Sequence, residues 1–206
     1  MACAIGSANP QIPFDMRKQQ SLKVLALTMS ALWAGAAAQG GPSEKLSKGG
    51  LLGPNNELID VKGFNRATVD ALLLRESRRI SESQFIALAK EENTIVLDTR
   101  SAAKFALLHV KGAVHLNFSD LTTQSLARTI PNKDTRILIY CNNNFDKEVK
   151  KPVAFESKSP AMALNIPTFI TLHAYGYKNI YELGPLLDVK KTRISLVGMK
   201  LALNGN

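Results

Sequence analysis

The chain has 206 residues, 45% of them hydrophobic and 21% charged, and a formal net charge of +9 at neutral pH. This length permits one domain of ordinary size with a sizeable core, and the basic balance favours anions, acidic surfaces or anionic lipid as partners. The Lys and Arg residues are scattered and no DNA- or RNA-binding signature accompanies them, so the composition excludes a nucleic-acid-binding role.

The N-terminal region has the three parts of a secretory signal peptide. A basic stretch, Met16–Lys23, precedes an apolar run that ends in the small residues Ala36–Ala38. The run is shorter than the ~20 residues of a spanning helix, although a single membrane anchor is the alternative. We therefore predict a signal peptide over 16–38, a start-site overcall over 1–15, and a periplasmic or secreted mature protein without a spanning membrane helix.

Cleavage near Gln39 would change the cysteine chemistry. It would remove Cys3 and leave Cys141 as the only thiol, so no intramolecular disulfide could form. An unpaired Cys in an exported protein suggests a reactive thiol or an intermolecular partner. The alternative is a buried Cys that packs as a small hydrophobe. A position at a strand end, before three Asn residues, favours the reactive thiol.

A stretch rich in Gly, Pro, Ser and Lys predicts a flexible tether over 39–56, before an ordered domain over 57–190. Apolar spacing predicts a first helix around Val69–Leu73, and Ser81 with Gln84 forms a capping box that opens a second. We predict further helices after three N-terminal signals: Ser101, Ser119–Asp120 and Ser159–Pro160. The segment 191–206 is a C-terminal extension, as either a strand or a short helix.

Short apolar runs alternate with these helices. They predict strands over 94–97, 112–116, 136–140 and 179–183. Strands that alternate with helices imply an α/β fold with a parallel sheet covered on both faces. The run over 136–140 stops at Cys141, which predicts that a buried strand delivers the thiol to the carboxyl edge of the sheet, where such folds place their chemistry.

Four stretches resemble the rhodanese-like sulfurtransferases: IVLDTR, KFALLHVKGAVHLNFSDL, RILIYC and AYGYKNIYELG. The resemblance implies a five-stranded parallel sheet with helices on both faces. It also implies structural roles for the motif residues Asp98, Arg100, His109 and Gly112, and a catalytic role for Cys141. That Cys would take a sulfane sulfur from a donor such as thiosulfate, as a persulfide, and pass it to a thiol or cyanide, without a cofactor.

The residues after the Cys are the candidates for substrate binding. Backbone N–H groups of a curled loop and a helix N-terminus favour a thiolate, and Asn tolerates the left-handed conformations of such a curl. The candidates are Asn142, Asn143, Asn144, Phe145 and Lys147. With one Cys in the mature segment and three scattered His residues, we expect no metal site.

The loop departs from the family pattern. From Asn142 to Ser159 it has 18 residues and no Arg, so the next helix need not reach the sulfur, and a phosphatase, which needs an Arg there, is disfavoured. A long loop beside a reactive group is also typical of a gating or partner-docking loop. The rival hypothesis is therefore a non-catalytic rhodanese-like module that binds a protein or an anion.

Overall fold

The computed structural model describes residues 56–148 and 151–199. The predicted overcall, the signal peptide, nearly all of the tether and the last seven residues lie outside these ranges. The helices are α1 (Val61–Glu76), α2 (Glu82–Leu88), α3 (Ala102–Leu107), α4 (Thr123–Thr129) and α5 (Asn165–Ala174). Within the described ranges, no helix combines the length and the apolarity that a membrane span requires.

Five strands form one parallel sheet, in the order β1-β7-β5-β2-β4. They are β1 (Arg79–Ile80), β2 (Thr94–Asp98), β4 (Val114–His115), β5 (Arg136–Tyr140) and β7 (Ile180–Leu183). The predicted α/β fold with a five-stranded parallel sheet is thus confirmed. The strand predicted over 112–116 is shorter than expected, because Gly112 has a positive φ of 82° and belongs to the preceding turn.

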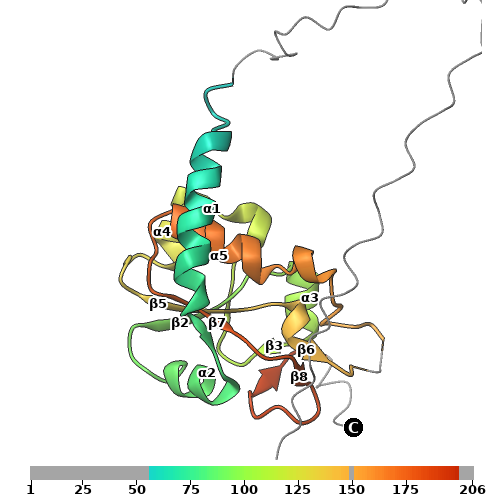
Figure 1. Ribbon diagram of the computed structural model, residues 1–206. Helices are drawn as coiled ribbons and strands as arrows, with labels where there is room; N and C mark the ends of the chain where they lie inside the picture. Colours follow the sequence, from blue (N-terminus) through green and yellow to red (C-terminus); the bar gives the residue numbers. More distant parts are fainter. Residues whose placement is uncertain (1–55, 149–150, 200–206) are drawn as a thin grey trace, which may run out of the picture. The chain divides into compact units, whose positions relative to one another are not determined.

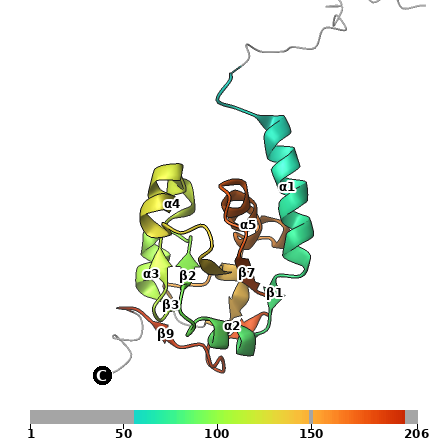
Figure 2. The same cartoon turned by 90° about the vertical axis from the view of Figure 1, so that its left-hand side faces the viewer.

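Alternate residues of β5 point to opposite faces of the sheet, as the period of a strand requires. Ile137 and Ile139 lie in one apolar cluster, with residues of α1, α4 and α5. Leu138 and Tyr140 lie in the other, with Phe85 of α2. Figure 2 shows α1, α4 and α5 standing together beyond one side of the sheet and α2 on the other.

Two short two-stranded sheets complete the described part of the chain. β3 (His109–Val110) pairs antiparallel with β9 (Leu196–Val197), and β6 (Phe145–Asp146) pairs parallel with β8 (Leu187–Asp188). Part of the C-terminal extension is therefore a strand. Gly198 follows β9 with a φ of 149°, and a Cβ there would lie 2.4 Å from the Leu107 carbonyl oxygen, so only Gly fits this close approach.

Local signals explain most helix starts. Ser81 and Gln84 form the predicted capping box of α2, and Ser101 caps α3. The prediction for α4 was displaced, because Thr122, not Ser119 or Asp120, is its cap and its side chain accepts from the Ser125 N–H. Ser159–Pro160 opens only a 3₁₀ turn, Pro160–Met162, and α5 begins at Asn165 (Figure 1).

Candidate active site

Cys141 follows the last residue of β5, the middle strand of the sheet, as the sequence predicts. Its side chain is only 1% exposed. The thiol is therefore buried, the alternative that its position at a strand end disfavoured. Two elements enclose the sulfur: the 3₁₀ helix Asn142–Asn144, into which the chain turns directly, and the start of α5, whose backbone N–H groups reach it from a distant part of the chain.

The start of α5 reaches the sulfur in spite of the long loop. Burial is the largest influence on Cys141 and raises the pKa of its thiol, to which the Glu182 carboxylate adds. Backbone N–H groups of Asn165, Asn143 and Leu164 act in the opposite direction and favour the thiolate, without offsetting burial. The result is a protonated thiol at neutral pH that already faces three hydrogen-bond donors for a developing negative charge.

Asn144 joins the three elements that meet at the thiol. Its Oδ1 accepts from the backbone N–H of Cys141 at 2.9 Å and from Nδ2 of Asn165 at 3.0 Å, and its Nδ2 donates to the carbonyl of Leu183 at 2.7 Å. Both Asn side chains are buried. This amide holds the end of β5, the end of β7 and the start of α5 at fixed spacing, which is how a distant helix comes to lie beside the Cys.

Asp98 and Arg100 form a buried ion pair at 2.6 Å, at the carboxyl end of β2. Tyr140 donates its hydroxyl hydrogen to Asp98, and Nη2 of Arg100 also donates to the Leu108 carbonyl at 2.8 Å. A buried carboxylate needs such partners, because an unpaired charge away from water is costly. The two residues therefore serve the architecture of the sheet edge, as the resemblance implies.

The long loop is held against this edge by its own backbone. Nη1 of Arg100 donates to the Ala154 carbonyl at 3.1 Å, and the Phe155 ring lies 4.4 Å from the Arg100 guanidinium. The Glu148 carboxylate accepts from the backbone N–H groups of Ala154 and Phe155. The loop returns to the site at Lys158, whose backbone exchanges two hydrogen bonds with the Asn143 side chain.

A cleft of about 540 Å³ opens beside the thiol. Cys141 does not line the cleft, but two residues next to it do: Asn142, its chain neighbour, and Leu164, whose N–H favours the thiolate. The remaining lining residues come from the segments that follow β2 and β4, including α3 and a 3₁₀ turn, and from the long loop: Thr99, Arg100, Ser101, Lys104, Asn117, Phe118, Ser119, Glu156, Ser157 and Lys158.

The comparison with protein families decides the assignment. The model of the Rhodanese-like domain matches residues 81–183. The chain belongs to the rhodanese-like family. The resemblance read from the motifs is thus confirmed, and the match begins at the cap of α2 and ends with the last residue of β7.

Solved structures similar to this rhodanese-like domain come from several bacteria. Protein hp1203 from Helicobacter pylori is 22% identical with a TM-score of 0.40, covering 64% of this chain and 99% of that one. BH2092 from Bacillus halodurans is 15% identical with a TM-score of 0.44, covering 66% and 88%. A rhodanese with anions from E. coli is 18% identical with a TM-score of 0.35, covering 51% and 98%. The comparison with curated proteins gives no match.

The candidate substrate-binding residues of the rhodanese-like domain divide into two groups. Asn142 lines the cleft, and Asn143 and Asn144 fix the loop and the thiol as described. Phe145 is fully buried against Phe155, and Lys147 lies 3.5 Å from Asp188, away from the lining. Among the described residues of this loop, the left-handed one is Lys147 rather than an Asn, with a φ of 59°.

Three charged residues at the cleft were not among the candidates: Lys104, Glu156 and Lys158. Nζ of Lys104 donates to the Val153 carbonyl at 2.6 Å and to Glu156 at 2.9 Å, which joins α3 to the long loop. The available signal was the cap Ser101, which places the first turn of α3 at the carboxyl edge of the sheet.

Nδ1 of His109 forms a hydrogen bond with the Phe105 carbonyl, and the imidazole stacks on the Phe105 ring. These contacts give His109 a structural role. The described residues contain no cluster suited to a metal.

Proposed function

We propose that this rhodanese-like domain is a sulfurtransferase that carries a sulfane sulfur on Cys141. The observation that carries the proposal is the set of N–H groups of Asn143, Leu164 and Asn165, which favour negative charge on the sulfur from two separate elements. A persulfide anion at this position would meet the same donors. The family membership supports the chemistry, and the cleft beside Asn142 supplies room for a donor.

The proposed reaction has two displacements. Cys141 first loses its thiol proton to water. The thiolate then attacks the outer sulfur of thiosulfate, a new S–S bond forms, and sulfite leaves with the electron pair of the bond that breaks. A thiol or cyanide then attacks the terminal sulfur of the persulfide. With cyanide, thiocyanate departs and the Cys141 thiolate is regenerated. No redox partner or cofactor enters this balance.

The charges at the cleft suit an anionic donor. Lys104 and Lys158 line it, and Glu156 is the one acidic side chain among the lining residues. Glu156 already pairs with Lys104, which leaves Lys158 to attract the donor as a point charge. Because Cys141 is closed off behind the lining, we propose that Asn142 or Leu164 must shift before the donor reaches the sulfur.

Mass spectrometry after incubation with thiosulfate tests this function. In a Cys3→Ser background, where Cys141 is the only thiol, we expect an adduct of about 32 Da, the mass of one sulfur atom, that cyanide removes. The further change Cys141→Ser should abolish the adduct while the circular dichroism spectrum is retained. A folded protein that gains no sulfur from thiosulfate or from an organic persulfide would refute the sulfurtransferase.

A non-catalytic binding module remains the second candidate, and one observation favours it. Burial raises the pKa of Cys141, whereas a catalytic thiol is expected to be rich in thiolate at neutral pH. In that case the long loop, with Ser157 and Lys158 on the cleft, would bind a protein or an anion instead. Retained binding of an anion such as sulfate by Cys141→Ser, with no sulfur transfer in the parent, would establish this alternative.

We also propose that the domain is exported. The basic and apolar segments over 16–38 support a cleaved signal peptide, and the ordered domain would begin near residue 57. Fractionation of the expressing cells should place the protein outside the cytoplasm with an N-terminus near Gln39. An intact Met1 or Met16 on the cytoplasmic protein would contradict export.

A further inference from the structure

The helix α1 has an apolar face that nothing in the described chain covers. Its inner side packs on α5 through Ala71, with Leu74 against the same cluster. On its outer side, Val69 is 58% exposed and Leu73 71% exposed, and Leu72 is partly exposed as well. Figure 1 shows the N-terminal turns of α1 projecting beyond α4 and α5.

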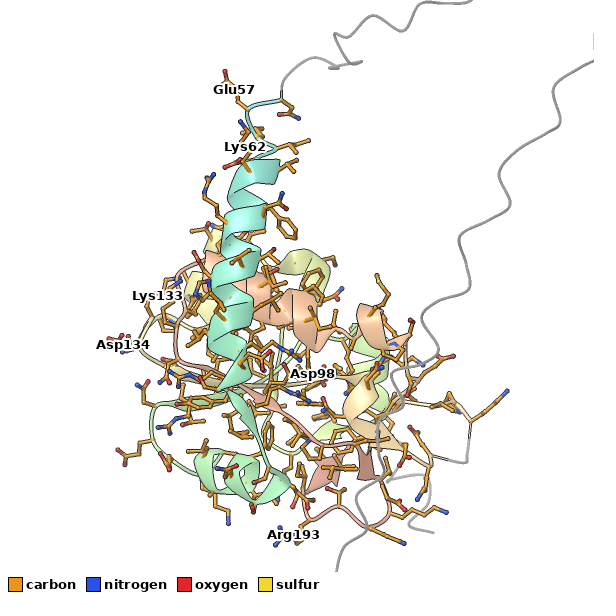
Figure 3. The ribbon with its side chains drawn as sticks, in the orientation of Figure 1. Glu57, Lys62, Asp98, Lys133, Asp134 and Arg193 are labelled. Carbon is orange, nitrogen blue, oxygen red and sulfur yellow. The ribbon has the colours of Figure 1, made fainter. Side chains whose placement is uncertain are left out.

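Two charged residues on that outer face lie symmetrically about Val69. Lys62 lies seven residues before Val69, and Glu76 lies seven residues after it, so all three fall on one side of the helix, at the spacing of a coiled-coil heptad. Figure 3 labels Lys62 near the projecting end of α1. Within the described ranges, neither Lys62 nor Glu76 takes part in an ion pair.

This pattern is self-complementary in one orientation only. If two copies of α1 pack antiparallel with Val69 on the two-fold axis, Lys62 of each copy meets Glu76 of the other, twice over. A parallel pair would instead place Lys62 beside Lys62 and Glu76 beside Glu76. A face shared between two copies must be complementary to itself, which the antiparallel pairing satisfies.

We propose that α1 is the dimerisation helix of this protein, and that its outer face packs antiparallel on the same face of a second copy around Val69. Leu72 and Leu73 supply the apolar contact beside the axis, and the Lys62–Glu76 pairs flank it. The mixed signs on this face argue against an anionic lipid surface, which would be repelled by Glu76 and the neighbouring Asp70. The proposal is independent of the chemistry at Cys141.

Sedimentation equilibrium of the full chain over the micromolar range tests the proposal. We expect the mass of two 22.4 kDa chains. Val69→Lys places two like charges at the axis and should weaken the dimer about tenfold or more. Leu186→Lys, at a residue that is similarly exposed at 61% but lies outside α1, should leave the dissociation constant unchanged.

Charge reversal tests the orientation. Lys62→Glu and Glu76→Lys should each weaken the dimer, and the double variant should restore it because the swapped charges again meet their opposites. A wild-type chain that stays monomeric, or a Val69→Lys dimer as tight as the wild type, would overturn the proposal. So would a double variant no tighter than the single ones, or a monomeric wild-type chain that binds anionic phospholipid vesicles through Val69.

Discussion

The Asn144 side-chain oxygen accepts a hydrogen bond from the backbone N–H of Cys141 at 2.9 Å, and the same side chain donates to the carbonyls of Leu183, the last residue of β7, and Pro185. Asn144, three residues after Cys141, thus fixes the end of β5, the strand that precedes the thiol. Because Asn165 of α5 bonds to the same oxygen, the geometry around the sulfur depends on one buried amide.

Replacing this amide should cost more than replacing its neighbour. Asn144→Ala leaves the Cys141 N–H and the Leu183 carbonyl buried without partners, so we expect a loss of about 2 kcal/mol or more in the free energy of unfolding. Asn143→Ala is the matched control, since its two bonds reach only the exposed loop at Lys158. Urea denaturation of both variants measures the difference, and equal losses would contradict the role of Asn144.

Removing the cation of the buried ion pair should be severe. Arg100→Met leaves the Asp98 carboxyl group buried with Tyr140 as its remaining side-chain partner, and we expect a loss of about 3–5 kcal/mol in the free energy of unfolding. Arg66→Met, at an ion pair whose Arg is 72% exposed, should change stability by less than about 0.5 kcal/mol. Thermal denaturation of the two variants side by side checks this contrast.

Alkylation should report the raised pKa of Cys141. In the folded Cys3→Ser protein, we expect the alkylation rate with iodoacetamide to keep rising at pH values above the ordinary titration range of a thiol. In urea the rate should reach its plateau at a lower pH, because unfolding removes the burial that raises the pKa. The linked stability is present below the unfolded pKa and is lost as pH rises through the folded one. The site geometry would be contradicted if the folded protein reached its plateau rate at a lower pH than the protein in urea.

The Glu182 carboxylate should contribute to that pKa. Since its charge raises the pKa of Cys141, Glu182→Gln should shift the alkylation profile of the folded protein to lower pH. Glu156→Gln, which removes a carboxylate at the cleft that does not act on the thiol, should leave the profile in place. Because Glu182 also holds Arg75 at 2.6 Å, a melting curve of each variant must first show that the domain is folded.

Much of the sheet and its edge could be predicted from sequence because the signals are local. The apolar run before Cys141 and the capping box at Ser81 each specify an element within a few residues. The helix α4 shows the limit of this approach, since Ser119, Asp120 and Thr122 all have capping side chains and only the folded chain decides among them.

The burial of the thiol could not be predicted, because its causes are distant in sequence. Leu164 and Asn165 reach Cys141 across a loop whose path depends on Phe155 packing against Phe145 and on Arg100 holding Ala154. Each of these contacts spans at least ten residues. The sequence shows which residues are apolar or charged, but its local patterns do not predict which of these residues contact one another in the fold.

The loop between Cys141 and α5 leaves the strand end and comes back to it, with Asn143 bonded to Lys158 where the two paths meet. An insertion or deletion between Asn143 and Lys158 alters the length of a loop whose two ends are bonded to each other. The entropy cost of closing a loop grows only slowly with its length. Natural variation can therefore change what this loop displays to other molecules while the sulfur and its donors stay where they are.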